Sequence, residues 1–268
     1  MELIENIHNS LIFYPSREFI SSPKQEGIEH EEVFINTSDG EKLHGYFFPA
    51  PAVKAGFSAE GGPTSSGKPA STKTVIYLHG NAQNVSAWYI APVEIQKYVP
   101  VNFLLIDYRG YGKSTGKPTV EGVIIDAQAM YQYLIDKGLK SEDISVYGRS
   151  IGGAIGFELA MKEKLKSIVI QSSFTSLRKI AKELYPFIPD QLISNNYFNS
   201  IELIKKIKVP VLISHGDKDE IIPISHSYKL FEAANEPKKL IILKGATHND
   251  ISDYLTNEYY KELNKLFL

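Results

Sequence analysis

The sequence predicts an α/β fold: a mostly parallel sheet of eight strands, with helices on both of its faces and a short cap. Two observations predict it. From residue 74 onward, short β-branched runs alternate with helical stretches, which is typical of parallel strands joined by crossover helices. The runs are also apolar throughout, as strands buried on both faces must be. The length of 268 residues suits one such domain, and the 43% of hydrophobic residues can fill its core.

The first strands are expected to form a hairpin at an edge of the sheet. Residues alternate in character in Glu32–Asn36 and Lys42–Phe48, on either side of the turn residues Ser38-Asp39-Gly40. Residues 1–30 precede the hairpin and are expected to pack on the body as an N-terminal segment. Apolar residues of this segment could share one helix face, and contact of that face with a membrane surface is the alternative.

Residues 50–73 differ in composition from the rest of the chain. They are rich in Gly, Pro, Ser and Ala and poor in large apolar residues, which is typical of a flexible surface loop. Because they join the hairpin to the next strand, we interpret them as an insertion and not as a domain boundary. Residues 31–268 are therefore expected to form a single domain.

The remaining elements follow in alternation. Strands are expected at Thr74–Leu78, Asn102–Ile106, Ile144–Tyr147, Ser167–Ile170, Pro210–Ser214 and Leu240–Leu243. Helices are expected at Val85–Tyr98, Val120–Lys137, Ile151–Lys164, Ile224–Ala234 and Ile251–Phe267. Only residues 172–209 are left for a cap. Its apolar residues suit a shallow cleft for acyl chains or simple esters, and they are Phe174, Leu184, Tyr185, Pro186, Phe187 and Ile188.

Ligands of such sheets bind beyond the carboxyl ends of the strands, so reactive side chains just after strands are the candidates. The strongest is Ser150, in Gly148-Arg149-Ser150-Ile151-Gly152, directly after one expected strand and directly before a helix. This is the G-x-S-x-G nucleophile elbow in its required context. A sharp strand-to-helix turn exposes the serine hydroxyl, and the glycines leave room for the turn.

A serine hydroxyl needs a base to accept its proton. Of the seven histidines, His248 follows the last strand, in a loop that can return over Ser150. His79 and His215 instead precede a glycine at a strand end. We therefore expect His248 to be the base.

The base in turn needs an acid that fixes its tautomer. The strand ending at Ser214 leads to three carboxylates, Asp217, Asp219 and Glu220. We favour Asp219, which lies one turn before the chain re-enters the fold, with Asp217 as the alternative. The order Ser, Asp, His along the chain matches that of folds with this elbow.

The tetrahedral intermediate of acyl transfer needs two N–H donors for its oxyanion. One is expected to be the amide of Ile151, the residue after the candidate nucleophile. The other is expected from the loop after Leu78, where we choose the amide of Asn81, with Ala82 as the alternative.

Other functional classes find little support. The net charge of −2 and the scattered lysines argue against nucleic acid as a partner. The absence of cysteine removes disulfides, thiolate metal sites and a cysteine nucleophile. Gly112-Lys113-Ser114 suggests a phosphate loop, but that motif needs a glycine at position 107, where Asp107 stands. We interpret residues 107–112 as a rigid turn beneath the site, and expect no cofactor and no metal ion.

These motifs together give the chain a family resemblance. It resembles the α/β-hydrolase superfamily from about Glu31 to its end, and looks most like the small Bem-type branch with its depalmitoylase-like proteins. The motifs that carry the resemblance are His79–Ala82, Asp107–Ser114, Gly148–Gly153, His215–Asp219 and His248–Asp250. The resemblance implies the α/β-hydrolase fold, a triad of Ser150, Asp219 and His248, and Asn81 and Ile151 as oxyanion donors.

The leading functional hypothesis is hydrolysis of small-molecule carboxylic esters through an acyl-serine intermediate. A thioesterase acting on an acylated protein or a small thioester shares the same triad and is the nearest alternative. A peptidase, or a binding protein on the same scaffold, is a weaker hypothesis. With no secretory signal or long apolar segment recognised in the sequence, we expect a cytoplasmic location.

Overall fold

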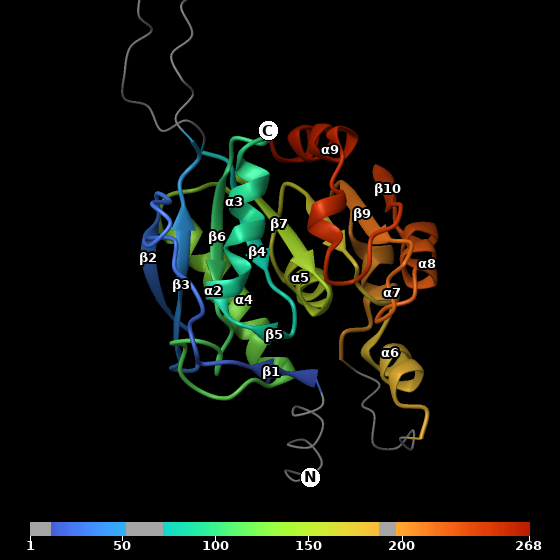
Figure 1. Ribbon diagram of the computed structural model, residues 1–268, viewed down its shortest axis with the longest axis horizontal. Coiled ribbons are helices and arrows are strands. Elements are labelled where there is room, and N and C mark those ends of the chain that lie inside the picture. Colours follow the sequence, from blue (N-terminus) through green and yellow to red (C-terminus); the bar gives the residue numbers. More distant parts are fainter. Residues whose placement is uncertain (1–11, 52–71, 188–196) are drawn as a thin grey trace, which may run out of the picture.

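The computed structural model describes residues 12–51, 72–187 and 197–268 (Figure 1). Its strands are β1 (Tyr14–Pro15), β2 (Glu31–Asn36), β3 (Lys42–Phe48), β4 (Thr74–Leu78), β5 (Ala82–Gln83), β6 (Asn102–Ile106), β7 (Ile144–Arg149), β8 (Ile168–Gln171), β9 (Val211–Gly216) and β10 (Lys238–Leu243). Its helices are α2 (Val85–Trp88), α3 (Ile90–Gln96), α4 (Val120–Asp136), α5 (Ile151–Lys162), α6 (Leu177–Leu184), α7 (Ser200–Leu203), α8 (Ser225–Ala233) and α9 (Asn257–Phe267), with 3₁₀ turns η1 (Ser141–Asp143), η3 (Ile204–Lys206) and η4 (Ile251–Tyr254).

Eight strands form one twisted sheet in the order β10-β9-β8-β7-β4-β6-β3-β2. The hairpin of β2 and β3 lies at one edge and is antiparallel to its neighbour β6, whereas the other neighbours run parallel. The predicted fold, a mostly parallel eight-stranded sheet with helices on both faces, is confirmed. A second, two-stranded pairing of β1 with β5 was not predicted.

Side chains alternate between two cores, one on each face of the sheet. In β4, Ile76 and Leu78 join the core under α4, α5 and α8, whereas Val75 and Tyr77 join the core under α2, α3 and α9. Figure 1 shows these helices flanking the sheet. Because both faces are covered, the central strands are apolar at every position, which is the pattern that identified them.

Two predicted helices are broken in the structure. The helix expected over Val85–Tyr98 divides at Tyr89 into α2 and α3, because Pro92 has no N–H to donate to the carbonyl of Trp88. The helix expected over Ile251–Phe267 divides into η4 and α9. Thr256 starts α9 as its N-cap, with its side chain accepting a hydrogen bond from the Tyr259 amide, so the earlier residues form a separate turn.

The described part of the N-terminal segment contacts the body. Phe13 is 3% exposed within the core, and β1 pairs in register with β5, Tyr14 opposite Ala82. Residues 1–11, and residues 52–71 of the predicted insertion, lie outside the described residues. Among the helices that are described, none combines the length and the apolar character needed to span a membrane.

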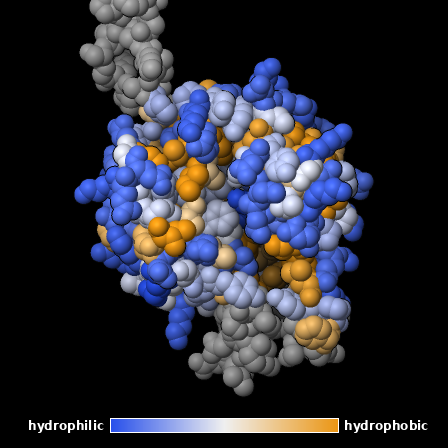
Figure 2. All heavy atoms as spheres, in the orientation of Figure 1, coloured by the Kyte–Doolittle hydropathy of each residue, from blue (hydrophilic) through white to orange (hydrophobic). Residues whose placement is uncertain are grey.

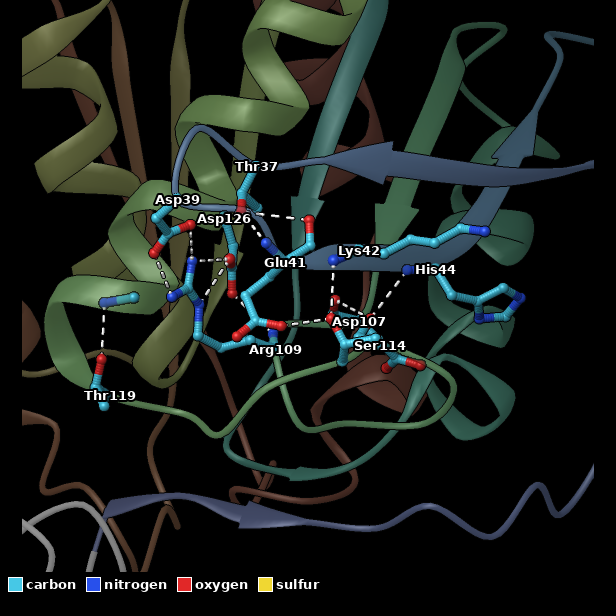
Figure 3. Close-up of polar contacts among 12 residues, drawn as sticks. Thr37, Asp39, Glu41, Lys42, His44, Asp107, Arg109, Ser114, Thr119 and Asp126 are labelled. Atoms are coloured by element: carbon cyan, nitrogen blue, oxygen red, sulfur yellow. Dashed lines mark hydrogen bonds and ion pairs between the residues drawn. The ribbon is translucent and has the colours of Figure 1, made fainter.

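The turn at residues 107–115 is held by the network in Figure 3. Ser114 Oγ donates to the carbonyl of Asp107 at 2.8 Å and accepts from the amide of His44 at 2.9 Å. The guanidinium of Arg109 bonds Asp39 at 2.7 Å and Asp126 at 2.8 Å. The lysine and serine that suggested a phosphate loop thus belong to a turn that is fastened to the hairpin and to α4.

Candidate active site

The sheet brings the three candidate catalytic residues to one edge. Ser150 lies between β7 and α5, Asp219 follows β9, and His248 follows β10. These strands are parallel, so their carboxyl ends meet on the same side of the sheet. Ser150 and His248, which are 98 positions apart in the sequence, therefore lie at the same edge of the sheet.

Ser150 has a strained backbone, with φ 56° and ψ −122°. Two glycines make this turn possible. A Cβ on Gly148 would lie 2.3 Å from the carbonyl oxygen of Gly152, and a Cβ on Gly152 would lie 2.0 Å from that of Leu78. Since neither position has space for a side chain, the sequence Gly-Arg-Ser-Ile-Gly fits a sharp elbow that presents the serine at the start of a helix.

Asp219 and His248 are hydrogen bonded, with His248 Nδ1 donating to Asp219 Oδ2 at 2.7 Å. The other carboxylate oxygen accepts from the amides of Ile221 at 3.0 Å and Ile222 at 2.8 Å. Burial raises the pKa of Asp219, but hydrogen bonds from His215 and His248 outweigh it and hold the pKa far below its usual range. The carboxylate is thus charged, and the tautomer it selects leaves His248 Nε2 without a proton.

The alternative acid, Asp217, has a different partner. Its Oδ1 accepts from the amide of Gly245 at 2.6 Å, so it joins the loop after β9 to the loop after β10. Glu220 is exposed. Of the three carboxylates, only Asp219 contacts His248 among the described residues.

A second histidine contacts Asp219, which sequence reasoning did not anticipate. His215 Nε2 lies 3.2 Å from Asp219 Oδ2 and 2.8 Å from the carbonyl oxygen of Ile222. Its Nδ1 accepts from the hydroxyl of Ser227 at 2.6 Å, which leaves the proton on Nε2. The only signal in the sequence was its place at a strand end before a glycine, and His79 shares that signal.

The loop after β4 lies against the elbow. A Cβ on Gly80 would lie 3.8 Å from the Cβ of Ser150. His79 Nδ1 donates to the carbonyl of Gly80 at 2.7 Å, and because a peptide is planar and trans, the Asn81 N–H points the opposite way. Burial lowers the pKa of His79 to about 4, so the ring is neutral at neutral pH.

The next peptide of this loop is fixed as well. The carbonyl of Asn81 accepts from the amide of Tyr14 at 2.9 Å and from the hydroxyl of Tyr111 at 2.8 Å. No turn, loop or cap hydrogen bond within the described residues uses the amide of Asn81 or of Ile151. The two amides expected to bind the oxyanion are therefore not engaged by these bonds.

Arg149 joins the elbow to the histidine loop. Its Nη2 donates to the carbonyl of His248 at 2.8 Å and to that of Asn249 at 3.3 Å. The described hydrogen bonds do not include one between Ser150 and His248. Catalytic hydrogen bonds are often long before substrate binds, so the shared sheet edge and this brace are the geometric link between the two side chains.

Some residues of the predicted cap are buried in the core, and others are exposed at the surface. Phe174 is 4% exposed and belongs to the core, which differs from the predicted cleft lining, whereas Leu184 is 44% and Phe187 80% exposed. Helix α6 is anchored by Glu183, whose carboxylate bonds His226 at 2.8 Å. Figure 2 shows hydrophobic atoms around a hollow beside α6. Ile188 lies outside the described residues.

No group of three or more histidine, aspartate or glutamate side chains in the described ranges could hold a metal ion.

Comparisons with known proteins agree with this fold. The family model described as the alpha/beta hydrolase fold matches residues 73–202, and an acetyl xylan esterase model matches residues 190–266. Protein Rv2307c of Mycobacterium tuberculosis is 32% identical over 90% of this chain and 80% of its own. Protein bem46 of Schizosaccharomyces pombe is 31% identical over 88% of this chain and 76% of its own. The esterase Pf2001 of Pyrococcus furiosus superposes with a TM-score of 0.72 at 23% identity, over 95% of this chain and 97% of its own.

Proposed function

The chain belongs to the α/β-hydrolase family, and we propose that it hydrolyses carboxylic esters through an acyl intermediate on Ser150. The observation that carries the proposal is the 2.7 Å hydrogen bond between His248 and a charged Asp219, at the sheet edge where Ser150 is held in a strained elbow. A histidine oriented by a buried carboxylate is the base that a serine nucleophile requires.

The proposed reaction has two halves. His248 Nε2 accepts the proton of Ser150 Oγ, which attacks the ester carbonyl, and the oxyanion accepts hydrogen bonds from the amides of Asn81 and Ile151. The C–O bond then breaks as His248 returns the proton to the leaving alcohol. Water attacks the acyl-serine in the same way, giving its proton to His248, and the carboxylic acid leaves as Ser150 recovers its hydrogen.

Exposed apolar residues of the predicted cap indicate the substrate class. Leu184 and Phe187 are exposed apolar side chains at the end of α6 and just after it, and such side chains suit an apolar acyl group. The comparisons support an ester: one matching model is named for acetyl xylan esterase, and a structural neighbour is an esterase. A thioester uses the same machinery and is the rival substrate.

The test combines a covalent probe with a substrate panel. A fluorophosphonate should label the folded wild type and leave the Ser150→Ala variant unlabelled. p-Nitrophenyl esters and acyl thioesters of graded chain length should be hydrolysed by the wild type, with esters preferred, and not by Ser150→Ala. Labelling of neither protein would refute the serine mechanism. Labelling with a consistent preference for thioesters would keep the mechanism and replace the substrate.

A further inference from the structure

A cavity of about 650 Å³ lies on the sheet face that α2, α3 and α9 cover. Its walls come from α2 and α3 on one side and from η4 and α9 on the other. Its floor is formed by the ends of β4, β7 and β8, including Tyr77, Arg149 and Gln171. Figure 2 shows pale atoms of intermediate hydropathy in a hollow between α3 and the segment before α9. Ser150 is not part of its lining.

Arg149 places an unneutralised cation in this floor. The residue is 7% exposed, and none of the ion pairs among the described residues includes it. Its Nη2 is occupied by the two carbonyls of the histidine loop, but its Nε has no hydrogen-bond partner within the described chain. Its guanidinium carbon lies 5.0 Å from the ring centroid of Trp88. A buried charge without a counterion is costly, so this arrangement favours an anion.

Gln171 adds a second donor at the same place. Arg149 and Gln171 are partners in the parallel register of β7 and β8, so their side chains leave neighbouring strands on the same face. Gln171 is 2% exposed, and its Nε2 also lacks a partner within the described chain. A guanidinium beside an amide N–H matches the two oxygens of a carboxylate.

The rim and walls of the cavity further restrict the class of ligand that it can bind. Glu94 and Asp253 line the cavity and are exposed, and Glu94 is paired with Lys97 at 2.5 Å. These acids are screened by solvent but disfavour a multiply charged anion such as phosphate. The aromatic walls include Trp88 and the stacked rings of Tyr98 and Tyr260, whose centroids are 4.0 Å apart.

We propose that this cavity binds a small monocarboxylate with an apolar body, its carboxylate on Arg149 and Gln171 and its body along the aromatic walls. The site is separate from the chemistry at Ser150 and does not depend on the proposed hydrolysis. Because Arg149 also holds the carbonyl of His248, a bound carboxylate acts on the same guanidinium that braces the histidine loop.

The test uses the fluorescence of Trp88, which is the single tryptophan of the chain. Hexanoate, 1-hexanol and inorganic phosphate are titrated into the Ser150→Ala protein. Hexanoate should give a saturable change, and the alcohol and phosphate should not. Arg149→Gln should weaken hexanoate binding about 10- to 100-fold, the range of a charge-assisted hydrogen bond. Gln171→Glu should abolish binding, because it supplies an internal carboxylate to Arg149.

Two controls keep the result decisive. Phe187→Ala, in the exposed cap, should leave hexanoate binding unchanged; if it weakens binding while Arg149→Gln does not, hexanoate occupies the hollow beside α6 and the proposal fails. Thermal unfolding checks the fold of each variant, and Gln171→Glu carries the test if Arg149→Gln does not fold. The proposal is overturned if Gln171→Glu binds hexanoate as tightly as the parent protein does, or if 1-hexanol binds as tightly as hexanoate. It is also overturned if no saturable response is seen up to about 10 mM hexanoate, which is tenfold above a 1 mM dissociation constant.

Discussion

Asp217 and Asp219 are two residues apart and bond to different partners. Asp219 accepts from His248 Nδ1 at 2.7 Å, whereas Asp217 accepts from the amide of Gly245 at 2.6 Å. Asp219→Asn replaces the acceptor with an amide and permits the wrong tautomer of His248. We expect kcat on a p-nitrophenyl ester to fall by roughly 10³- to 10⁴-fold, and Asp217→Asn to have little effect because an amide oxygen still accepts from Gly245.

Kinetics of both variants, with circular dichroism to confirm folding, measure the difference. The reverse ranking would move the acid to Asp217.

Composition and local sequence pattern do not distinguish Asp217 from Asp219 as the partner of the histidine. The strand-end placement indicated the region, but the choice between two aspartates depends on how the loops after β9 and β10 fold over each other.

At the scale of elements, the elbow depends on a close approach of β7, α5 and β4. A methyl group on Gly148 would meet the carbonyl oxygen of Gly152 at 2.3 Å, and that oxygen belongs to the backbone and not to a flexible side chain that could move aside. We expect Gly148→Ala to abolish activity and to lower the unfolding midpoint strongly.

Gly156→Ala, in the helix α5 that follows the elbow, is the matched control. There a Cβ would meet Val146 Cγ1 at 3.1 Å, and this mild crowding is offset by the higher helix propensity of alanine, worth about 1 kcal/mol. The unfolding midpoint of Gly156→Ala should therefore change little, as thermal denaturation can show. An active, stable Gly148→Ala would contradict the role of the glycine in the elbow.

The elements differ in how far the sequence could predict them. The central strands were predictable because burial on both faces makes them apolar at every position. The breaks at Tyr89 and before α9 were missed, because one proline and one N-cap threonine interrupt patterns that otherwise continue. The pairing of β1 with β5 involves two residues per strand, too few for any periodicity, yet it holds the loop that carries Asn81.

At the scale of the whole molecule, Arg109 joins the hairpin to α4 through two carboxylates of different exposure. The side chain of Asp126 is 0% exposed and that of Asp39 is 38% exposed. Removing Asp126 leaves the buried guanidinium with one partner at the surface. We expect Asp126→Ala to lower the free energy of unfolding by about 3–5 kcal/mol. Asp39→Ala should cost about 0–1 kcal/mol because solvent screens that pair.

The pKa values of the two carboxyl groups are shifted in opposite directions. Hydrogen bonds from Arg109 and Thr37 lower the pKa of Asp39 to about 2, whereas burial raises the pKa of Asp126 to about 6. The stability that Asp39 contributes is therefore present above its unfolded pKa, near 3.8, and is lost as pH falls towards 2. The difference in unfolding free energy between wild type and Asp39→Ala, measured by urea denaturation, should shrink over that interval. A difference that stays constant from pH 5 to about 2 would show that the ion pair of Asp39 with Arg109 contributes nothing measurable to stability.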